Sequence, residues 1–510
     1  MRVFATETGR GDGEKGNGQD EHKRAVPLCG TDGGGVPAAE RVGEGRPGRR
    51  ETDLDTFVLL QARKAERNRR IGALRDSADF ELSAAALCRE LLGETAATLL
   101  REVLKQKVIC TADHHGSVCC SQFFQADLLF AMLLEKLGDS GAIVPVLAAG
   151  QVELENSTYS RGISAYFSAE RKMRLPLFPD KHGVQLASYA GPVTREMTDR
   201  FRGRFISPET DPALRAALEG ILSGVYEAED VLRAGSFSEQ MTVAGSRLTD
   251  HLFQKAPAFA YLEMETAVRP LLLAELGDVS SLLFRLLYDP EMRRRAVRHR
   301  LPDGTTPGDL LFRAADGKGR KILLSLTEDG FLTGRDWRRQ PVCFGTGKEE
   351  LSALIREKRV FPGVFTEALL LFFERGITWI GGMFQSCYLP QWQEGLAGVL
   401  EKAGCAAQAE RIRAYDCSGY LCGPMPALYR GDGFATTAGP VELWERPVPF
   451  ERFRELARKT TLWDAHLIGL SEMYYDLTVR SEREPDWYRK IAEELFRAYP
   501  ENTAAGVTEG

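Results

Sequence analysis

The sequence predicts an α/β protein: a Rossmann-like parallel sheet, interrupted by a largely helical insertion and preceded by a disordered N-terminal tail. Apolar, strand-like stretches at 108–112 and 143–149 each end abruptly in polar residues, and an apolar helical pattern from Gln122 to Leu137 lies between them. Strand, helix and strand in this order form the unit of a parallel sheet, and such crossovers are nearly always right-handed. The second stretch is apolar throughout, as is typical of a parallel strand that is covered on both faces.

Changes of composition along the chain predict its organisation. Residues 1–50 are rich in glycine and lack apolar periodicity, so we expect this tail to be disordered. A helical lead-in follows at 51–104, with Gly93 as a break, and Gly138 stands where a helix C-cap is expected. The other predicted regions are a first core part at 105–194, a helical insertion at 195–300, a β-hairpin region at 301–358, a second core part at 359–445 and C-terminal helices at 446–510.

Periodicity and turn residues predict individual elements inside these regions. Asp-Gly pairs and short apolar runs within 303–326 indicate hairpins. Predicted helices cover 213–226, 237–253, 261–287, 362–375, 391–403, 450–458 and 465–474, and predicted strands cover 376–380, which ends in Gly381-Gly382, and 413–416.

Composition excludes several classes of protein. The chain has 510 residues, of which 43% are hydrophobic and 27% charged, as expected for a globular protein of two or three domains. A net charge of −6 argues against a nucleic-acid partner. No apolar run reaches the roughly 18–20 residues that span a bilayer. Ten cysteines without a repeated Cys-x-x-Cys pair favour a reducing compartment, so we expect a cytoplasmic protein without membrane partners.

The most informative motif is Asp113-His114-His115, which directly follows the first predicted strand. Side chains at this position lie at the carboxyl edge of a parallel sheet, where α/β enzymes bind their ligands. Histidine titrates near neutral pH and can act as a general base, and imidazole with carboxylate can also bind a divalent metal. The alternative is a hydrogen-bonded turn in which Asp113 caps backbone donors.

The second predicted strand also ends in polar residues, namely Gln151, Glu153, Glu155 and Asn156. Parallel strands place both polar ends on the same edge, so we treat the two groups as one candidate site. Glu153 and Glu155 share one side if the segment stays extended, and they would then complete a set of histidines and carboxylates. A solvated acidic loop is the alternative.

A third group of residues is expected to bind the substrate. The turn at 116–121 precedes a helix N-terminus, where free backbone N–H groups favour an anion, and this places Gly116, Ser117 and Ser121 at the substrate. Gln385 and Asp416 follow later predicted strands and are placed there as well. The turn lacks a dinucleotide fingerprint, and the sequence leaves open whether a divalent metal or a nucleotide is the cofactor.

A series of motifs over roughly 105–440 carries a family resemblance. Its members are the turn at 111–116, the Val-Pro-Val core at 144–146, the Gly381-Gly382 strand end with Tyr388 and Trp392, and the Met-Pro strand at 425–430. In this order they resemble the cysteine-adding enzymes of bacillithiol biosynthesis, which implies a Rossmann-like core with a helical insertion and a ligase activity. The family has an acidic turn where this chain has 150–153, so the resemblance implies shared architecture more than a shared substrate.

The Asp-His-His triplet after a strand also resembles the signature of the DHH phosphoesterases, which are manganese-dependent enzymes. This resemblance implies a metal-dependent phosphoester hydrolase. That family also binds its metals with aspartates at the ends of earlier strands. In this chain the residues between the tail and the triplet offer Asp53, Asp55, Asp76 and Asp79, all in helical surroundings.

The sequence therefore favours a cytoplasmic enzyme that acts on a small anionic metabolite by ligase- or transferase-like chemistry. His114 or His115 is expected to be the base, and Glu153 and Glu155 are expected to orient the substrate or bind a metal. A metal-dependent phosphoester hydrolase and a non-catalytic ligand-binding or scaffold protein are the alternatives. The oligomeric state is left open.

Overall fold

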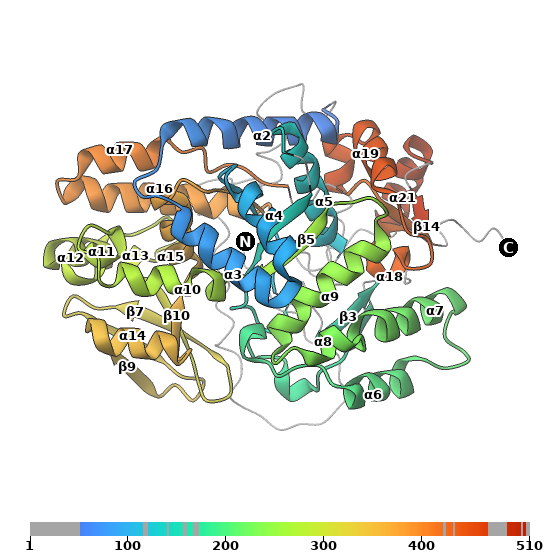
Figure 1. Cartoon of the computed structure of the whole chain (residues 1–510), viewed down its shortest axis with the longest axis horizontal. Coiled ribbons are helices and arrows are strands. Elements are labelled where there is room, and N and C mark those ends of the chain that lie inside the picture. Colours follow the sequence, from blue (N-terminus) through green and yellow to red (C-terminus); the bar gives the residue numbers. More distant parts are fainter. Residues whose placement is uncertain are drawn as a thin grey trace.

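The chain folds into a mixed α/β structure in which helices surround a small parallel sheet (Figure 1). The predicted tail at 1–50 and the residues Gly116 and Ser117 lie outside the described part of the chain. The computed structural model describes residues 52–115, 121–139, 142–156, 161–166, 173–421, 425–431, 434–467, 487–500 and 503–505.

The parallel sheet has four strands. They are hydrogen-bonded in the order β11-β1-β2-β5, and nearly all of their residues are buried. The strands predicted at 108–112, 143–149 and 376–380 are confirmed as three of them. The strands are β1 (Val108–Thr111), β2 (Ile143–Ala148), β5 (Ala258–Glu263) and β11 (Thr378–Gly381).

The predicted helical lead-in is confirmed, and it packs onto this sheet. Helix α4 and the crossover helix α5 both contact β2, α2 packs on α5, and α3 pairs with α4 in front of the sheet (Figure 1). Gly93 and Gly138 follow helices with φ values of 90° and 80°, which only glycine adopts without strain. The helices are α2 (Leu54–Ile71), α3 (Ala78–Leu92), α4 (Glu94–Leu104) and α5 (Ser121–Lys136).

The region at 195–300 is largely helical, as expected, but it also contributes one strand to the parallel sheet. Its strand β5 pairs with β2 along all six residues, in the place where we expected a helix from Tyr261 onward. A short apolar run that is buried on every side carries no periodicity, so a strand and a helix cannot be distinguished there. The helices of this region are α6 (Arg195–Phe205), α7 (Pro212–Ile221), the π-helical η4 (Leu222–Tyr226), α8 (Glu229–Arg233), α9 (Phe237–Leu252), α10 (Met264–Glu275), α11 (Leu282–Tyr288) and α12 (Pro290–Arg298).

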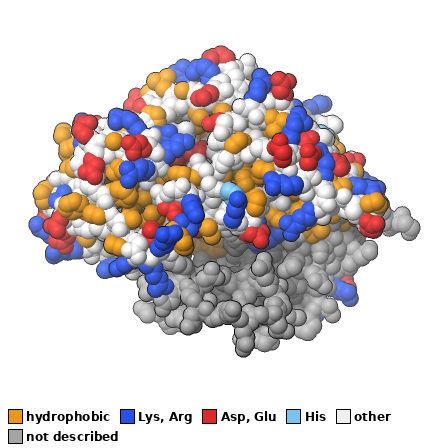
Figure 2. Space-filling model, turned by 90° about the horizontal axis from the view of Figure 1, so that it is seen from below, with side chains coloured by type: hydrophobic (Ala, Val, Ile, Leu, Met, Phe, Trp, Pro, Cys, Tyr) orange, Lys and Arg blue, Asp and Glu red, His pale blue; other side chains and the backbone are white. Residues whose placement is uncertain are grey.

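The predicted β-hairpins are confirmed as a second, antiparallel sheet with the strand order β10-β6-β7-β8-β9. Basic and acidic side chains are interspersed with apolar ones on the face of the molecule shown in Figure 2. The elements of this region are α13 (Pro307–Leu310), β6 (Phe312–Ala315), β7 (Lys321–Leu326), β8 (Phe331–Arg335), β9 (Pro341–Gly345), α14 (Lys348–Arg356) and β10 (Val360–Pro362).

The strand predicted at 413–416 is wrong. Helix α17 continues to Ala414, and Arg413 faces solvent, where it pairs with Glu394 and Glu401. A half-exposed, ion-paired segment offers no apolar face for a sheet. The predicted helix at 465–474 is described only through residue 467, where it is helical. In the described ranges, no helix combines the length and apolarity needed to cross a membrane.

The remaining elements complete the fold. They are β3 (Gly162–Ala165), β4 (Met173–Pro176), the short η2 (Asp180–His182) and η3 (Ala187–Tyr189), α15 (Val364–Ala368), the π-helical η5 (Leu369–Glu374), α16 (Gln385–Lys402), α17 (Ala406–Ala414), β12 (Leu428–Gly431), β13 (Phe434–Thr437), α18 (Pro440–Leu443), α19 (Phe450–Lys459), α21 (Trp487–Ala498) and β14 (Thr503–Ala505).

Candidate functional site

The candidate site lies where the four parallel strands end, an edge of the sheet that we call the carboxyl edge. Polar residues follow each strand there. The backbone N–H of His115 after β1 donates to the carbonyl of Ala149 after β2 (2.8 Å), so the first two strand ends are held together beyond the sheet. Glutamates end and follow β5, and Gln385 follows β11.

Glu265 is fixed by the turn after β2. Its two carboxylate oxygens accept hydrogen bonds from the backbone N–H groups of Gly150 and Gln151, both at 2.8 Å. A Cβ at position 150 would lie 2.9 Å from Glu265 Oε2, so this close approach requires glycine. Burial and the neighbouring charge of Glu263 raise the pKa of Glu265 to about 7. A carboxyl group with this pKa can both donate and accept a proton near neutral pH.

His115 belongs to a buried hydrogen-bond chain that leads to Glu263. Its Nε2 lies 2.5 Å from the carbonyl oxygen of Ser238, and the hydroxyl of Ser238 donates to the carboxylate of Glu263. A carbonyl oxygen only accepts, so we assign the proton to Nε2 of His115. Burial lowers the pKa of this imidazole. His115 is therefore placed to position Ser238 and Glu263, and its Nε2 is not free to act as a base.

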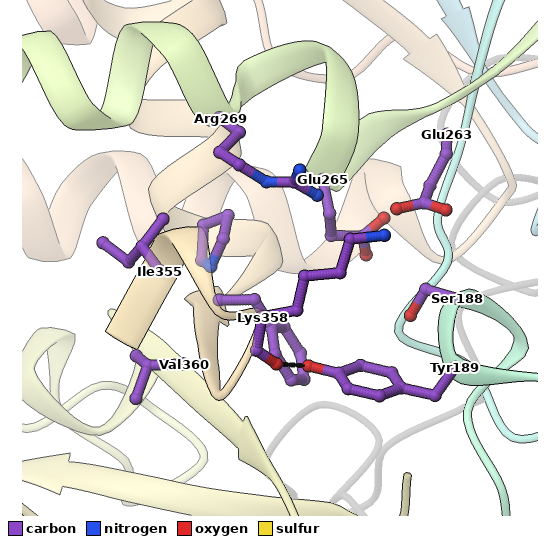
Figure 3. Close-up of a pocket in the computed structure, with 10 residues that line it drawn as sticks. Ser188, Tyr189, Glu263, Glu265, Arg269, Ile355, Lys358 and Val360 are labelled. Carbon is purple, nitrogen blue, oxygen red and sulfur yellow. Dashed lines mark hydrogen bonds between the residues drawn. The ribbon is translucent and has the colours of Figure 1, made fainter. Parts of the chain in front are cut away.

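A pocket opens beside the two glutamates (Figure 3). The cavity is small, about 20 Å³ or room for about one water molecule, and it is open to solvent. Figure 3 shows the side chain of Lys358 extending toward Glu263 and Glu265, and the hydroxyl of Tyr189 donates to the backbone carbonyl of Lys358. Arg269 donates to the hydroxyl of Thr266 at 3.2 Å. The lining residues are Ser188, Tyr189, Glu263, Glu265, Arg269, Ile355, Lys358, Val360, Phe361 and Pro362.

Behind the pocket lies a third carboxyl group, that of Glu367. The side-chain amide of Gln151 donates to it and to the carbonyl of Pro362, both at 3.3 Å. Complete burial and the charges of Glu265 and Glu263 raise the pKa of Glu367 well above its usual value. We therefore expect Glu367 to be protonated and neutral at physiological pH.

His114 and Glu153 lie within electrostatic range of the same amine, that of Lys321 on β7. Burial and then the charge of Lys321 lower the pKa of His114 to about 4. Burial raises the pKa of Glu153, and Lys321 opposes this shift. The carboxyl edge therefore holds a neutral imidazole and a weakly acidic carboxyl group close to one cation.

Several predicted site residues have structural partners instead. Glu155 pairs with Arg161 (2.5 Å), and the segment bends at 154–156 instead of staying extended. The side chain of Asn156 donates to the carbonyl of Glu153 (3.0 Å), and the hydroxyl of Ser121 bonds that of Thr437.

Asp416 also has a partner elsewhere, and Asp113 lies near two buried titratable groups. Asp416 pairs with Arg67 on α2 (3.1 Å) and accepts from Ser418, at the start of a turn. Asp113 follows β1, and its charge raises the pKa values of the buried Asp127 and Tyr261. Asp113 thus lies within electrostatic range of residues on α5 and β5.

Sequence reasoning missed Glu263, Glu265, Lys321 and Glu367. The pattern at 258–265 contained a signal for two of them, because an apolar run ends there in Glu-Met-Glu, as the other strands end in polar residues. Lys321 and Glu367 come from the antiparallel sheet and from α15, and nothing local marks them.

Gln385 is held at the end of β11 by a contact that requires glycine. Its Oε1 accepts from the hydroxyl of Thr111 (2.7 Å), and a Cβ at Gly381 would lie 2.0 Å from that oxygen. We expect Gly381→Ala to lower the free energy of unfolding by about 1–3 kcal/mol in urea denaturation, because the buried bond must break. Gly317→Ala is the control, since no atom lies within 4 Å of its added Cβ. Equal stability of the two variants would contradict this assignment.

Among the described residues, no group of three or more histidine, cysteine, aspartate or glutamate side chains is arranged to hold a metal ion. No family model matches the chain, and no curated protein matches it at a significant level.

Proposed function

We propose that this protein is a cytoplasmic enzyme that acts on a small anionic metabolite by ligase- or transferase-like chemistry, with Glu265 as its general acid–base. One observation carries the proposal. A buried carboxyl group, fixed by two backbone N–H groups and with a pKa near neutrality, lies at the end of a parallel strand and lines an open pocket. Perturbed carboxyl groups in clefts are typical of catalytic sites.

The strand order supports a Rossmann-like arrangement, a fold that binds ligands at the carboxyl edge of its sheet. Across the sheet from β5 to β11, the strands are the third, second, first and fourth in chain order. This is the order of the first four strands of a Rossmann sheet. We therefore propose a Rossmann-like arrangement, with its switch of direction between β1 and β11. His114, Thr111 and Gln385 stand at that point.

The charges around the pocket indicate the kind of substrate. Arg269 and Lys358 line it, and neither comes within 4 Å of a carboxylate of the described residues. A substrate with a carboxylate or phosphate would supply their counter-charge while its reacting group faces Glu265. Ligase and transferase reactions need a proton removed from a nucleophile, and Glu265 is positioned for this step.

The test begins with a thermal-shift panel of anionic metabolites on the wild-type protein, followed by turnover assays of the molecules that stabilise it. We expect Glu265→Gln to bind such a metabolite within a few-fold of wild type and to lose activity about 100-fold or more, since only proton transfer is removed. Glu357→Gln, at an exposed position next to Lys358, is the control and should retain activity.

Two outcomes would overturn the proposal. If the Glu265→Gln variant turns the metabolite over as fast as wild type, Glu265 is not the acid–base group. Binding without turnover of any partner substrate would favour the non-catalytic ligand-binding protein.

A further inference from the structure

Two cations of the antiparallel sheet lie on one face, toward the carboxyl edge. Arg313 on β6 is opposite Leu323 on β7, and Lys321 on β7 is opposite Ala315 on β6. Opposite residues share a face, and so do alternate residues of one strand, so Arg313 and Lys321 are diagonal neighbours. Such neighbours lie about 7–8 Å apart, close enough for long side chains to reach one group between them.

Neither cation has an acidic partner within 4 Å in the described part of the chain. The guanidinium of Arg313 donates only to backbone carbonyls, those of Asp309 and Phe312 (both 2.8 Å), and the amine of Lys321 makes no hydrogen bond there. Arg375 shows what burial normally requires, because it is fully buried and pairs with Asp79 and Glu275. Arg313 and Lys321 are less buried than Arg375, and each keeps some exposure to solvent.

The groups around the two cations also point to an absent counter-charge. Burial lowers the pKa of Lys321, and the charge of Arg313 lowers it further. The charges of Glu153 and Glu265 oppose this shift. Burial lowers the pKa of Arg313 to about 10. His114, which also faces Lys321, stays neutral and adds no charge. The site therefore has two positive charges that repel each other, within electrostatic range of Glu153 and Glu265.

We propose that Arg313 and Lys321 form a subsite for an oxyanion, a carboxylate or phosphate group of the substrate. The fork of the guanidinium presents two parallel donors that match such a group, and the ammonium supplies a point charge beside it. The subsite adjoins Glu265, which is within electrostatic range of Lys321. This inference deepens the proposed function, because it specifies which residues hold the anionic part of the metabolite while Glu265 handles the proton.

The experiment measures binding of inorganic phosphate and, separately, of acetate to the full chain by calorimetry and thermal shift. Wild type is expected to bind at least one of them, and the stronger of the two identifies the group. We expect Lys321→Met, which keeps the apolar stem, to weaken this binding about tenfold or more, and Arg313→Lys to weaken it by less. Lys318→Met, an exposed lysine of the same hairpin, is the matched control and should bind as wild type does.

The outcomes separate this inference from the proposed function. Equal binding to wild type and Lys321→Met, or no binding of either anion to wild type, would overturn the subsite. Glu265→Gln should retain phosphate or acetate binding, because the proton-transfer group is not a ligand of the anion. Loss of turnover in Glu265→Gln together with unchanged anion binding in Lys321→Met would support the function and reject the subsite.

Discussion

Arg375→Met is expected to lower the free energy of unfolding by about 3–5 kcal/mol, because it removes the fully buried cation that compensates the buried carboxylate of Glu275. Arg375, Glu275 and Glu374 are each about 1% exposed. The guanidinium donates to Glu275 at 2.6 Å and to Asp79 at 2.5 Å, which joins the start of α3 to the end of α10. Without it Glu275 keeps only Arg75 (3.1 Å), whose side chain is partly exposed, so the buried carboxylate is less well compensated.

Chemical denaturation at pH 7 measures this loss. Arg413→Met is the matched control, since Arg413 also pairs with two glutamates but at the surface, where we expect a change of less than about 1 kcal/mol. Arg375→Met with Glu275→Met should recover much of the lost stability, because no buried charge then remains unpaired. A loss for Arg375→Met no larger than that of the control would contradict this account of the cluster.

The elements that the sequence predicts correctly are those whose pattern is decided locally. The apolar runs of β1 and β2, the glycine after α5 and the Asp-Gly turns of the hairpins need no information from distant residues. Strand β5 was missed because its burial on every side removes periodicity. The strand predicted at 413–416 was wrong, because Arg413 lies at the surface of a helix, where it pairs with two glutamates of α16.

The candidate site was predictable only in part, for a related physical reason. A polar residue after a strand marks the carboxyl edge, and this located His114, Gln151 and Glu153. Whether such a residue has a free functional group depends on partners far along the chain. Glu155 forms an ion pair with Arg161, and Lys321 lies on a strand of the other sheet. Glu265 and Glu367 interact through space although they are about 100 residues apart in the chain, so no sequence pattern predicts that interaction.

The stability of the wild-type protein should fall as the pH rises from about 4.5 to 7, in part because of Glu265. Its pKa rises from an ordinary 4.5 to about 7 on folding, so the folded state holds the proton more tightly than the unfolded state. The contribution is fully present below pH 4.5 and is lost as the pH passes through 7. Its size is about 3 kcal/mol, at about 1.4 kcal/mol for each tenfold change in proton affinity.

Comparison with Glu265→Gln isolates this group, because Glu367 and Glu374 also have raised pKa values and give the wild type a slope of the same sign. Glutamine does not titrate, so the stability of wild type relative to the variant should decrease by about 3 kcal/mol between pH 4.5 and pH 8. The constant offset between the two proteins reflects the altered bonds to Gly150 and Gln151 and does not matter here. A difference that stays flat over this range would show that folding leaves the pKa of Glu265 unchanged. Glu265 would then be a weaker base than the proposed acid–base step requires.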